Sequence, residues 1–154
     1  MDLQTVKRVL VPTDFSDPSA EALASAIALG RATGATLDLL HVAFDTAYAV
    51  PPPIDVAVVP VDLGKVMERV QASLAAEVAE VRAAGLTCES ATPMGRPETE
   101  IVARATATHA DLIVMGTHGR RGINRALLGS DAESVVRYSP VPVLLVPASG
   151  RRTR

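Results

Sequence analysis

The sequence contains no tryptophan, 3% aromatic residues and a single cysteine. With so few aromatic side chains, a core has to be built from Val, Leu, Ile and Ala. The lone Cys88 excludes an internal disulfide and leaves no partner for a structural zinc site. No apolar run approaches the ~18 residues that cross a bilayer. A net charge of −2 argues against a dedicated nucleic-acid-binding protein.

The composition is that of one globular domain: 154 residues, 48% of them hydrophobic and 21% charged. We assign residues 1–148 to this domain and interpret 149–154 as a basic, solvated tail. The chain shows no secretory signal pattern near its start, so we expect a cytoplasmic protein whose Cys88 is an inert, partly buried thiol.

Apolar strand-like and helix-like segments alternate along the chain. Strands are predicted over residues 6–11, 37–42, 86–92, 112–115 and 141–146. Helices are predicted to begin at Asp17–Pro18 with Asp17 as the N-cap, at Leu63, at Pro97 and near Asp131. In the helix that begins at Leu63, the charged residues Glu68, Arg69, Glu77, Glu80 and Arg82 are assigned to a solvated face. Residues 43–60, rich in proline, are interpreted as an irregular excursion, with a lid as one possible role.

This alternation predicts an α/β fold: an open, twisted, five-stranded parallel sheet with helices on both faces. A strand order of 3-2-1-4-5 would make the first and fourth strands neighbours. The turns after these strands, Pro12-Thr13-Asp14 and the glycine-rich loop that follows Met115, would then line one crevice at the carboxyl ends of the strands, where such sheets bind ligands.

The loop after Met115 has the features of a phosphate-binding loop. Its glycines let backbone N–H groups approach a ligand, and its basic residues add cationic donors. Ser130 and Glu133 spell a capping box, so the next helix is predicted to begin there and to offer its N-terminus to a phosphate. The glycines of this segment are Gly116, Gly119, Gly122 and Gly129, and its basic residues are His118, Arg120, Arg121 and Arg125.

Other polar residues keep two readings. Asp14 either caps the first turn after its strand or accepts hydrogen bonds from a ribose or an adenine amine. His41 is read as a packed or hydrogen-bonded imidazole, and Glu98 and Glu100 as acidic residues near a helix N-terminus rather than as a metal pair. His118 has no nucleophile or carboxylate placed beside it, so we favour a loop residue near phosphates over a catalytic base.

The last predicted strand is uniformly apolar after Pro142, which lacks an N–H and so indicates an edge strand. An apolar edge tends to pair with another strand. Residues 141–146 therefore predict a homodimer, unless another segment of the same chain covers the edge.

The combination of three patches resembles the universal stress protein family over nearly the whole chain. They are residues 9–16 (Val-Leu-Val-Pro-Thr-Asp-Phe-Ser), the turn Gly95-Arg96-Pro97, and Gly116-x2-Gly119-x9-Gly129-Ser130. The resemblance implies a Rossmann-like fold of the adenine nucleotide alpha hydrolase type. It also implies membership of the ATP-binding subgroup and dimerisation through the last strand.

The family's binding residues carry over to this sequence by position. The adenosine would be surrounded by Pro12, Thr13, Asp14 and Val42. The phosphates would be surrounded by Met115, Gly116, His118, Gly119, Arg120, Gly129 and Ser130, with Asp131 next in the chain. The ligand would be ATP, with AMP or ADP as alternatives, and Mg²⁺ would be held through the phosphate oxygens.

Two functions follow as hypotheses. The first is an ATP-binding stress-response module that senses or signals with little or no hydrolysis, since no general base is evident. The second is a nucleotide-independent dimeric module that docks a protein partner. Nucleotidyl transfer ranks last, because the paired histidines or conspicuous lysine of such sites are missing. No membrane or nucleic-acid partner is expected.

Overall fold

A computed structural model describes residues 2–43, 62–117 and 128–147. After a short 3-10 turn (Leu3–Thr5), strands β1 (Arg8–Pro12), β2 (Thr36–Leu40), β3 (Cys88–Ala91), β4 (Leu112–Gly116) and β5 (Val143–Val146) alternate with helices α1 (Asp17–Thr33), α2 (Leu63–Ala83), α3 (Pro97–Ala107) and α4 (Ser130–Tyr138). The strands form one parallel five-stranded sheet in the order β3-β2-β1-β4-β5. The predicted fold class and strand order are therefore confirmed.

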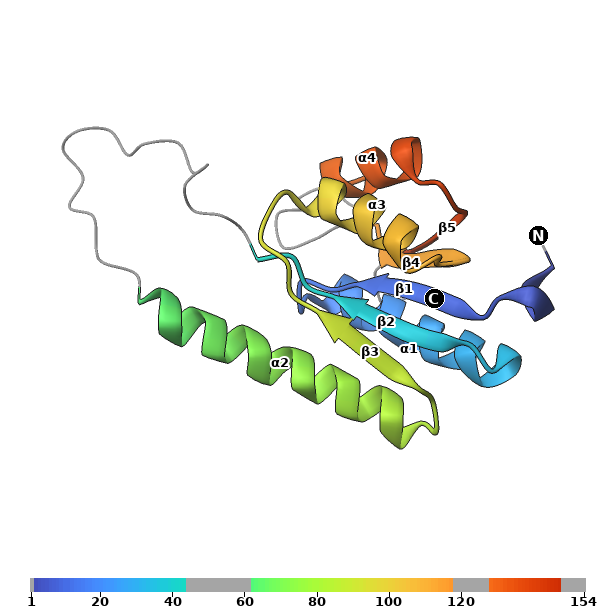
Figure 1. Cartoon of the computed structure of the whole chain (residues 1–154), viewed down its shortest axis with the longest axis horizontal. Coiled ribbons are helices and arrows are strands. Elements are labelled where there is room, and N and C mark those ends of the chain that lie inside the picture. Colours follow the sequence, from blue (N-terminus) through green and yellow to red (C-terminus); the bar gives the residue numbers. More distant parts are fainter. Residues whose placement is uncertain (1, 44–61, 118–127, 148–154) are drawn as a thin grey trace, which may run out of the picture.

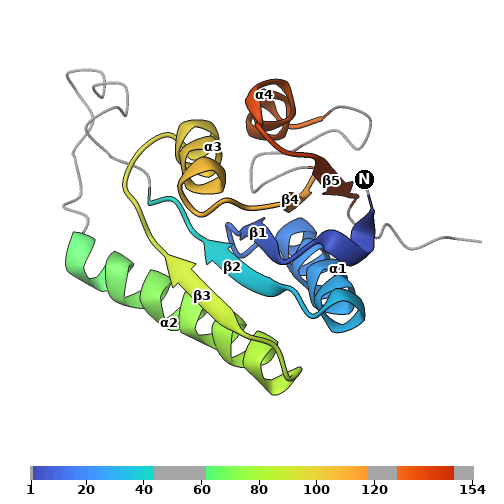
Figure 2. The same cartoon turned by 45° about the vertical axis from the view of Figure 1, so that its right-hand side comes forward.

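Helices cover both faces of the sheet, as Figures 1 and 2 show. Helices α1 and α2 lie on one face and α3 and α4 on the other. Alternate residues of each strand enter two separate apolar clusters, one under each helix pair; Val9 and Val11 belong to the first, Leu10 to the second. Because β1, β2 and β4 are buried on both faces, their sequences are apolar almost throughout.

The ends of α1 follow the local sequence, with one correction. The predicted N-cap, Asp17, is already helical; Ser16 is the N-cap, with an extended ψ of 164°, and Pro18 lies in the first turn. Gly34 ends the helix as predicted. Its φ of 73° is left-handed, and its N–H donates to Gly30 O at 2.8 Å.

Helix α2 departs from its predicted apolar face. Leu74 and Val81 are buried, but Leu63 is 56% exposed and Val66 42% exposed. Two residues that we had assigned to the solvated face also contact the sheet: Glu77 is half-buried, and the Arg82 guanidinium donates to Cys88 O at 3.2 Å. Cys88 is 5% exposed, and burial raises the pKa of its thiol to about 11, which fits the predicted inert cysteine.

One charged pair inside the fold was not predicted. Asp38 in the middle of β2 is 0% exposed, and both of its carboxylate oxygens accept hydrogen bonds at 2.9 Å from Arg104 on α3. The two-pronged geometry satisfies the carboxylate that burial has removed from water.

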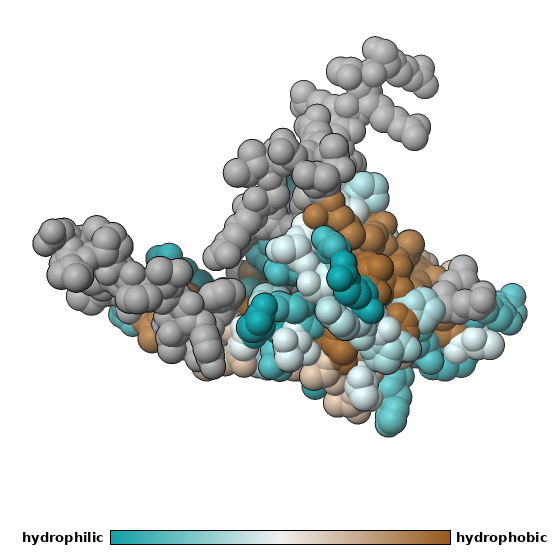
Figure 3. All heavy atoms as spheres, turned by 90° about the horizontal axis from the view of Figure 1, so that it is seen from above, coloured by the Kyte–Doolittle hydropathy of each residue, from teal (hydrophilic) through white to brown (hydrophobic). Residues whose placement is uncertain are grey.

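The two edge strands of the sheet are β3 and β5. Within the part of the chain that the structure describes, β3 pairs with β2 alone and lies beside α2, and β5 pairs with β4 alone and contacts α1. Leu144 on β5 is 44% exposed, and Figure 3 shows apolar side chains gathered on the side of the molecule that carries α3 and α4. No described helix is both long and apolar enough to cross a membrane.

Candidate functional site

The carboxyl ends of β1 and β4 lie side by side because the two strands are neighbours in the sheet. The turn after β1 and the residues that flank the glycine-rich loop therefore meet at one rim. They line a cavity of about 750 Å³. A cavity of this size at a strand-order reversal is where open α/β sheets bind small ligands.

The cavity brings together all of the predicted site residues that the structure describes. Those lining it are Pro12, Thr13, Asp14, Val42, Met115, Gly116, Gly129, Ser130 and Asp131. The remaining predicted site residues, His118, Gly119 and Arg120, lie outside the described residues. The binding role of the set stays a prediction, but the nine described residues converge on one cavity.

Every polar atom of Thr13 takes part in a hydrogen bond. Its N–H donates to Leu40 O at 2.9 Å, and its carbonyl oxygen lies 2.9 Å from His41 Nδ1. Its hydroxyl donates to Glu77 Oε1 at 2.9 Å and accepts from the Phe15 N–H at 3.2 Å. With 6% of its surface exposed, Thr13 is a buried, fully hydrogen-bonded residue of the cavity lining.

Asp14 and Phe15 give the turn its shape. The Asp14 carboxylate accepts hydrogen bonds from the backbone N–H and the hydroxyl of Ser16, so the turn-capping reading of Asp14 is present in the structure. Phe15 has a left-handed φ of 61°, a strained conformation for an aromatic residue. Its ring stacks on His41 with centroids 4.6 Å apart, which confirms His41 as a packed, hydrogen-bonded imidazole.

Neither Phe15 nor His41 was predicted to line the site, although both do. Strain of this kind concentrates at functional sites. The signal in the sequence was weak: a bulky residue directly after Thr-Asp reveals nothing of its φ.

The start of α4 differs from the predicted capping box. Gly129 is the N-cap, with an ordinary φ of −63°, and as a glycine it provides no side-chain cap of its own. Ser130 is the first helical residue, and the Glu133 N–H donates to Gly129 O at 2.8 Å as part of the helix. An α-helix cannot pair the N–H groups of its first turn internally. A helix N-terminus whose N-cap is a glycine therefore faces the cavity.

Gly116 is glycine for a packing reason. A Cβ built on it would lie 3.0 Å from the carbonyl carbon, the carbonyl oxygen and the Cβ of Pro18. The close approach lets the start of α1 pack against the end of β4, and it does not use a positive φ. This revises the sequence argument, in which backbone freedom and ligand approach explained the glycine.

The mouth of the cavity carries charged side chains from the start of α3. Arg96, 77% exposed at its side chain, lies 2.6 Å from Glu98, and both line the cavity. Glu98 is thus explained by an ion pair and by its place in the first turn of α3. No group of three or more metal-ligating side chains occurs among residues 2–43, 62–117 and 128–147.

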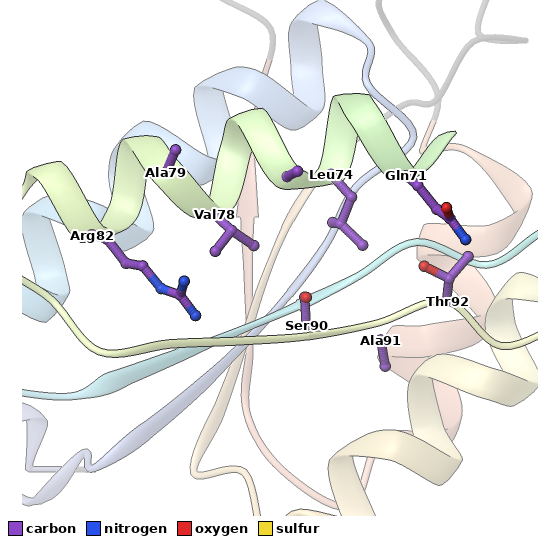
Figure 4. A pocket seen from close by; sticks show the side chains of 9 residues that line it. Gln71, Leu74, Val78, Ala79, Arg82, Ser90, Ala91 and Thr92 are labelled. Atoms are coloured by element: carbon purple, nitrogen blue, oxygen red, sulfur yellow. The ribbon is translucent and has the colours of Figure 1, made fainter. Parts of the chain in front are cut away.

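A second hollow, of about 690 Å³, lies between α2 and β3 (Figure 4). Leu74, Val78 and Arg82 point into it from the helix, and Ser90 points toward the helix from the strand. None of the predicted site residues lines it, and it lies beside the sheet edge rather than at the strand-order reversal. The cavity of about 750 Å³ at the carboxyl ends of β1 and β4, which we call the rim cavity, is therefore the candidate site.

Comparison with known proteins decides the family. The model of the universal stress protein family matches residues 5–147. The chain belongs to the universal stress protein family. Relatives include universal stress protein MJ0531 of Methanocaldococcus jannaschii, 34% identical over 91% of this chain and 81% of that protein, and a Thermus aquaticus universal stress protein, 36% identical over 91% and 98%.

Solved universal stress protein structures agree with the fold. The structure of protein MJ0577 superposes with a TM-score of 0.79 at 27% identity, covering 94% of this chain and 98% of that one. A universal stress protein solved in complex with cAMP superposes with a TM-score of 0.69 at 29% identity, covering 94% and 98%.

Proposed function

We propose that this universal stress protein binds ATP, or AMP or ADP, in the rim cavity and acts in the stress response as a nucleotide-dependent sensor with little or no hydrolysis. The observation that carries the proposal is the meeting of the β1 turn, the end of β4 and the N-terminus of α4, whose N-cap is a glycine, around one cavity. The relative solved with cAMP supports an adenine nucleotide as the class of ligand.

In this proposal the two halves of the cavity hold different parts of the nucleotide. Pro12, Thr13, Asp14 and Val42 would hold the adenosine. Val42 follows β2, and its main-chain groups make no hydrogen bond to another described residue, so they are suited to pair with the edge of a base. The phosphates would lie at Gly116, Gly129 and Ser130 and beside the loop residues His118, Gly119 and Arg120.

The donor set fits a metal held mainly by the ligand. The carboxylates that line the cavity are Asp14, Glu98 and Asp131. Asp14 bonds Ser16, Glu98 bonds Arg96, and Asp131 accepts from the Ser130 hydroxyl at 3.5 Å. Mg²⁺ usually keeps several waters and joins substrate phosphates through one or two protein carboxylates. Asp131, in the first turn of α4, is the carboxylate beside the proposed phosphates. Bound Mg²⁺ would neutralise phosphate charge there.

The test is calorimetric titration of the purified protein with ATP and AMP, together with mass spectrometry of the freshly purified, denatured protein for co-purified nucleotide. We expect measurable affinity and very slow turnover. Absence of binding to every adenine nucleotide would refute the proposal.

The variant Gly129→Ala locates the ligand. The φ and ψ of Gly129, −63° and 149°, suit alanine, so the substitution adds a methyl group at the helix start without backbone strain. We expect ATP affinity to fall by about tenfold or more, or about 1.4 kcal/mol. Gly64→Ala, on α2, is the control. Unchanged affinity in Gly129→Ala would place the phosphates elsewhere.

The exposed apolar edge favours a second candidate function, a dimeric interaction module that needs no nucleotide. Strand β5 pairs with β4 alone among the described elements, and Leu144 is 44% exposed. We propose a homodimer in which two β5 strands pair, in either function. Leu144→Lys should shift the mass in light scattering from dimer to monomer, because a charge opposes pairing at an apolar edge. A wild-type monomer would refute the dimer.

A further inference from the structure

Glu77, on α2, contacts Thr13, a residue that lines the rim cavity. Its Oε1 accepts the Thr13 hydroxyl at 2.9 Å. Its Oε2 is shielded from solvent and has no hydrogen-bond partner among the described residues. A carboxylate oxygen left in this state favours protonation, since burial disfavours the charged form. Burial accordingly raises the pKa of Glu77, against the opposing Thr13 hydrogen bond, and the charges of Glu80 and Asp14 raise it further.

The Thr13 hydroxyl has one proton and two acceptors within reach. Glu77 Oε1 lies at 2.9 Å and Ser19 Oγ at 3.4 Å, while the Phe15 N–H donates to the same hydroxyl oxygen. Ser19 donates its own proton to Ser16 O at 2.8 Å, so its oxygen is available as an acceptor. While Glu77 is ionised, the shorter, charge-assisted bond takes the Thr13 proton.

Protonation of Glu77 reverses this bond. A neutral Glu77 donates to Thr13 Oγ1, and Thr13 in turn donates to Ser19 on α1. The carboxyl proton stays on Glu77 and no bond between heavy atoms changes. The protonation state of a side chain on α2 is thereby transmitted to the turn that contains Asp14 and lines the cavity.

We propose that Glu77 is a positioning residue that links nucleotide binding to proton uptake, with tighter binding of anionic nucleotides when Glu77 is protonated. The inference rests on the proposed function and adds a mode of regulation to the same site. The sign follows from charge: protonation removes a negative charge close to the cavity, and this lowers the electrostatic cost of binding an anion there.

Several other titratable groups lie near Glu77 on the elements that pack around it. Asp14 follows β1, Glu80 lies on α2, and the Cys88 thiol of β3 senses the charge of Glu77. His41, after β2, contacts the carbonyl of Thr13 rather than Glu77. Variants of Glu77 itself are therefore needed to separate its titration from those of its neighbours and of the phosphates.

The experiment measures ATP affinity of the full chain by calorimetry between about pH 5 and 8, in two buffers of different ionisation enthalpy so that proton uptake is read directly. Glu77→Gln keeps the shape, removes the charge and can donate to Thr13. We expect the wild type to lose about three- to tenfold more affinity than Glu77→Gln as pH rises, the scale of one charge acting across a partly screened site. Glu68→Gln, which removes an exposed charge from the same helix, should behave as the wild type.

Thr13 variants test the relay. Thr13→Ser keeps the hydroxyl and should keep the wild-type pH profile, whereas Thr13→Val removes the hydroxyl and should change it. The carboxyl carbon shift of Glu77, followed by NMR in the nucleotide-free protein, should titrate above the range of an ordinary glutamate. Equal pH slopes and equal proton uptake in wild type and Glu77→Gln would overturn the inference while leaving the proposed function intact. Absence of nucleotide binding at every pH would overturn both.

Discussion

Two regions of the same sheet place polar side chains where the sequence is otherwise apolar, and they differ in how those side chains are satisfied. In the middle of β2, Asp38 is closed off from solvent and both its oxygens bond Arg104. At the carboxyl rim, the Thr13 turn, Gly116 and the start of α4 face a cavity of about 750 Å³. The Asp38–Arg104 pair is part of the internal packing of the fold, where the loss of one partner is costly, whereas the residues around the open cavity are accessible to a ligand.

Arg104→Met should produce the largest change in stability. It leaves the Asp38 carboxylate buried and unpaired, which costs about 3–5 kcal/mol of unfolding free energy. Chemical denaturation measures this loss, and ATP affinity should be unchanged because neither residue lines the cavity. The double variant Asp38→Leu with Arg104→Met removes both charges and should recover most of the loss. A single variant as stable as the wild type would contradict the structural role assigned to the pair.

Gly116→Ala should have an intermediate effect on the free energy of unfolding. It is measured by the same chemical denaturation and tests a residue of the rim. The added methyl group meets the backbone of Pro18 at 3.0 Å, an overpacking that costs about 1–3 kcal/mol. Gly129→Ala, by contrast, should reduce affinity with little loss of stability. Unchanged stability of Gly116→Ala would contradict the packing role that we assign to Gly116 at the rim.

Glu89→Gln should have the smallest effect. Glu89 lies opposite Asp38 in the strand register and bonds Arg8 at 2.6 Å, but it is exposed. The Arg8 hydrogen bond lowers the pKa of Glu89, so the contribution of the pair is present above the ordinary glutamate pKa and is lost as pH falls through the lowered value. The denaturation midpoint of Glu89→Gln should lie within error of the wild type near pH 7, since exposed pairs contribute little. A large shift of the denaturation midpoint would show that the exposed Arg8–Glu89 pair contributes to stability as the buried Asp38–Arg104 pair does.

The sequence predicted the strand order and the meeting of the β1 turn with the end of β4, because both rest on patterns that are visible along the chain. Alternation of strands and helices leads to a parallel sheet, and the turns after Val11 and Met115 stand out as polar. The family signature then named residues at both turns. Exposure of the last strand also followed from its proline and its apolar run.

The missed features depend on contacts between distant residues. Asp38 reads as one polar residue in an apolar run, and its partner lies 66 positions away. Glu77 has the spacing of a solvated helical face, yet the helix turns it toward Thr13, 64 positions earlier. The capping box failed because Gly129, one residue before Ser130, is the N-cap, and Ser130 is already the first helical residue.

The strand order also has a consequence for folding during synthesis of the chain. Strand β1, made first, acquires its neighbour β4 only after nearly three-quarters of the chain has been synthesised, since Val9 pairs with Leu112. Such long-range pairing is slow compared with local helix formation. The rim cavity between β1 and β4 is therefore completed late in folding, and a nascent chain that lacks β4 leaves one side of its central strand unpaired.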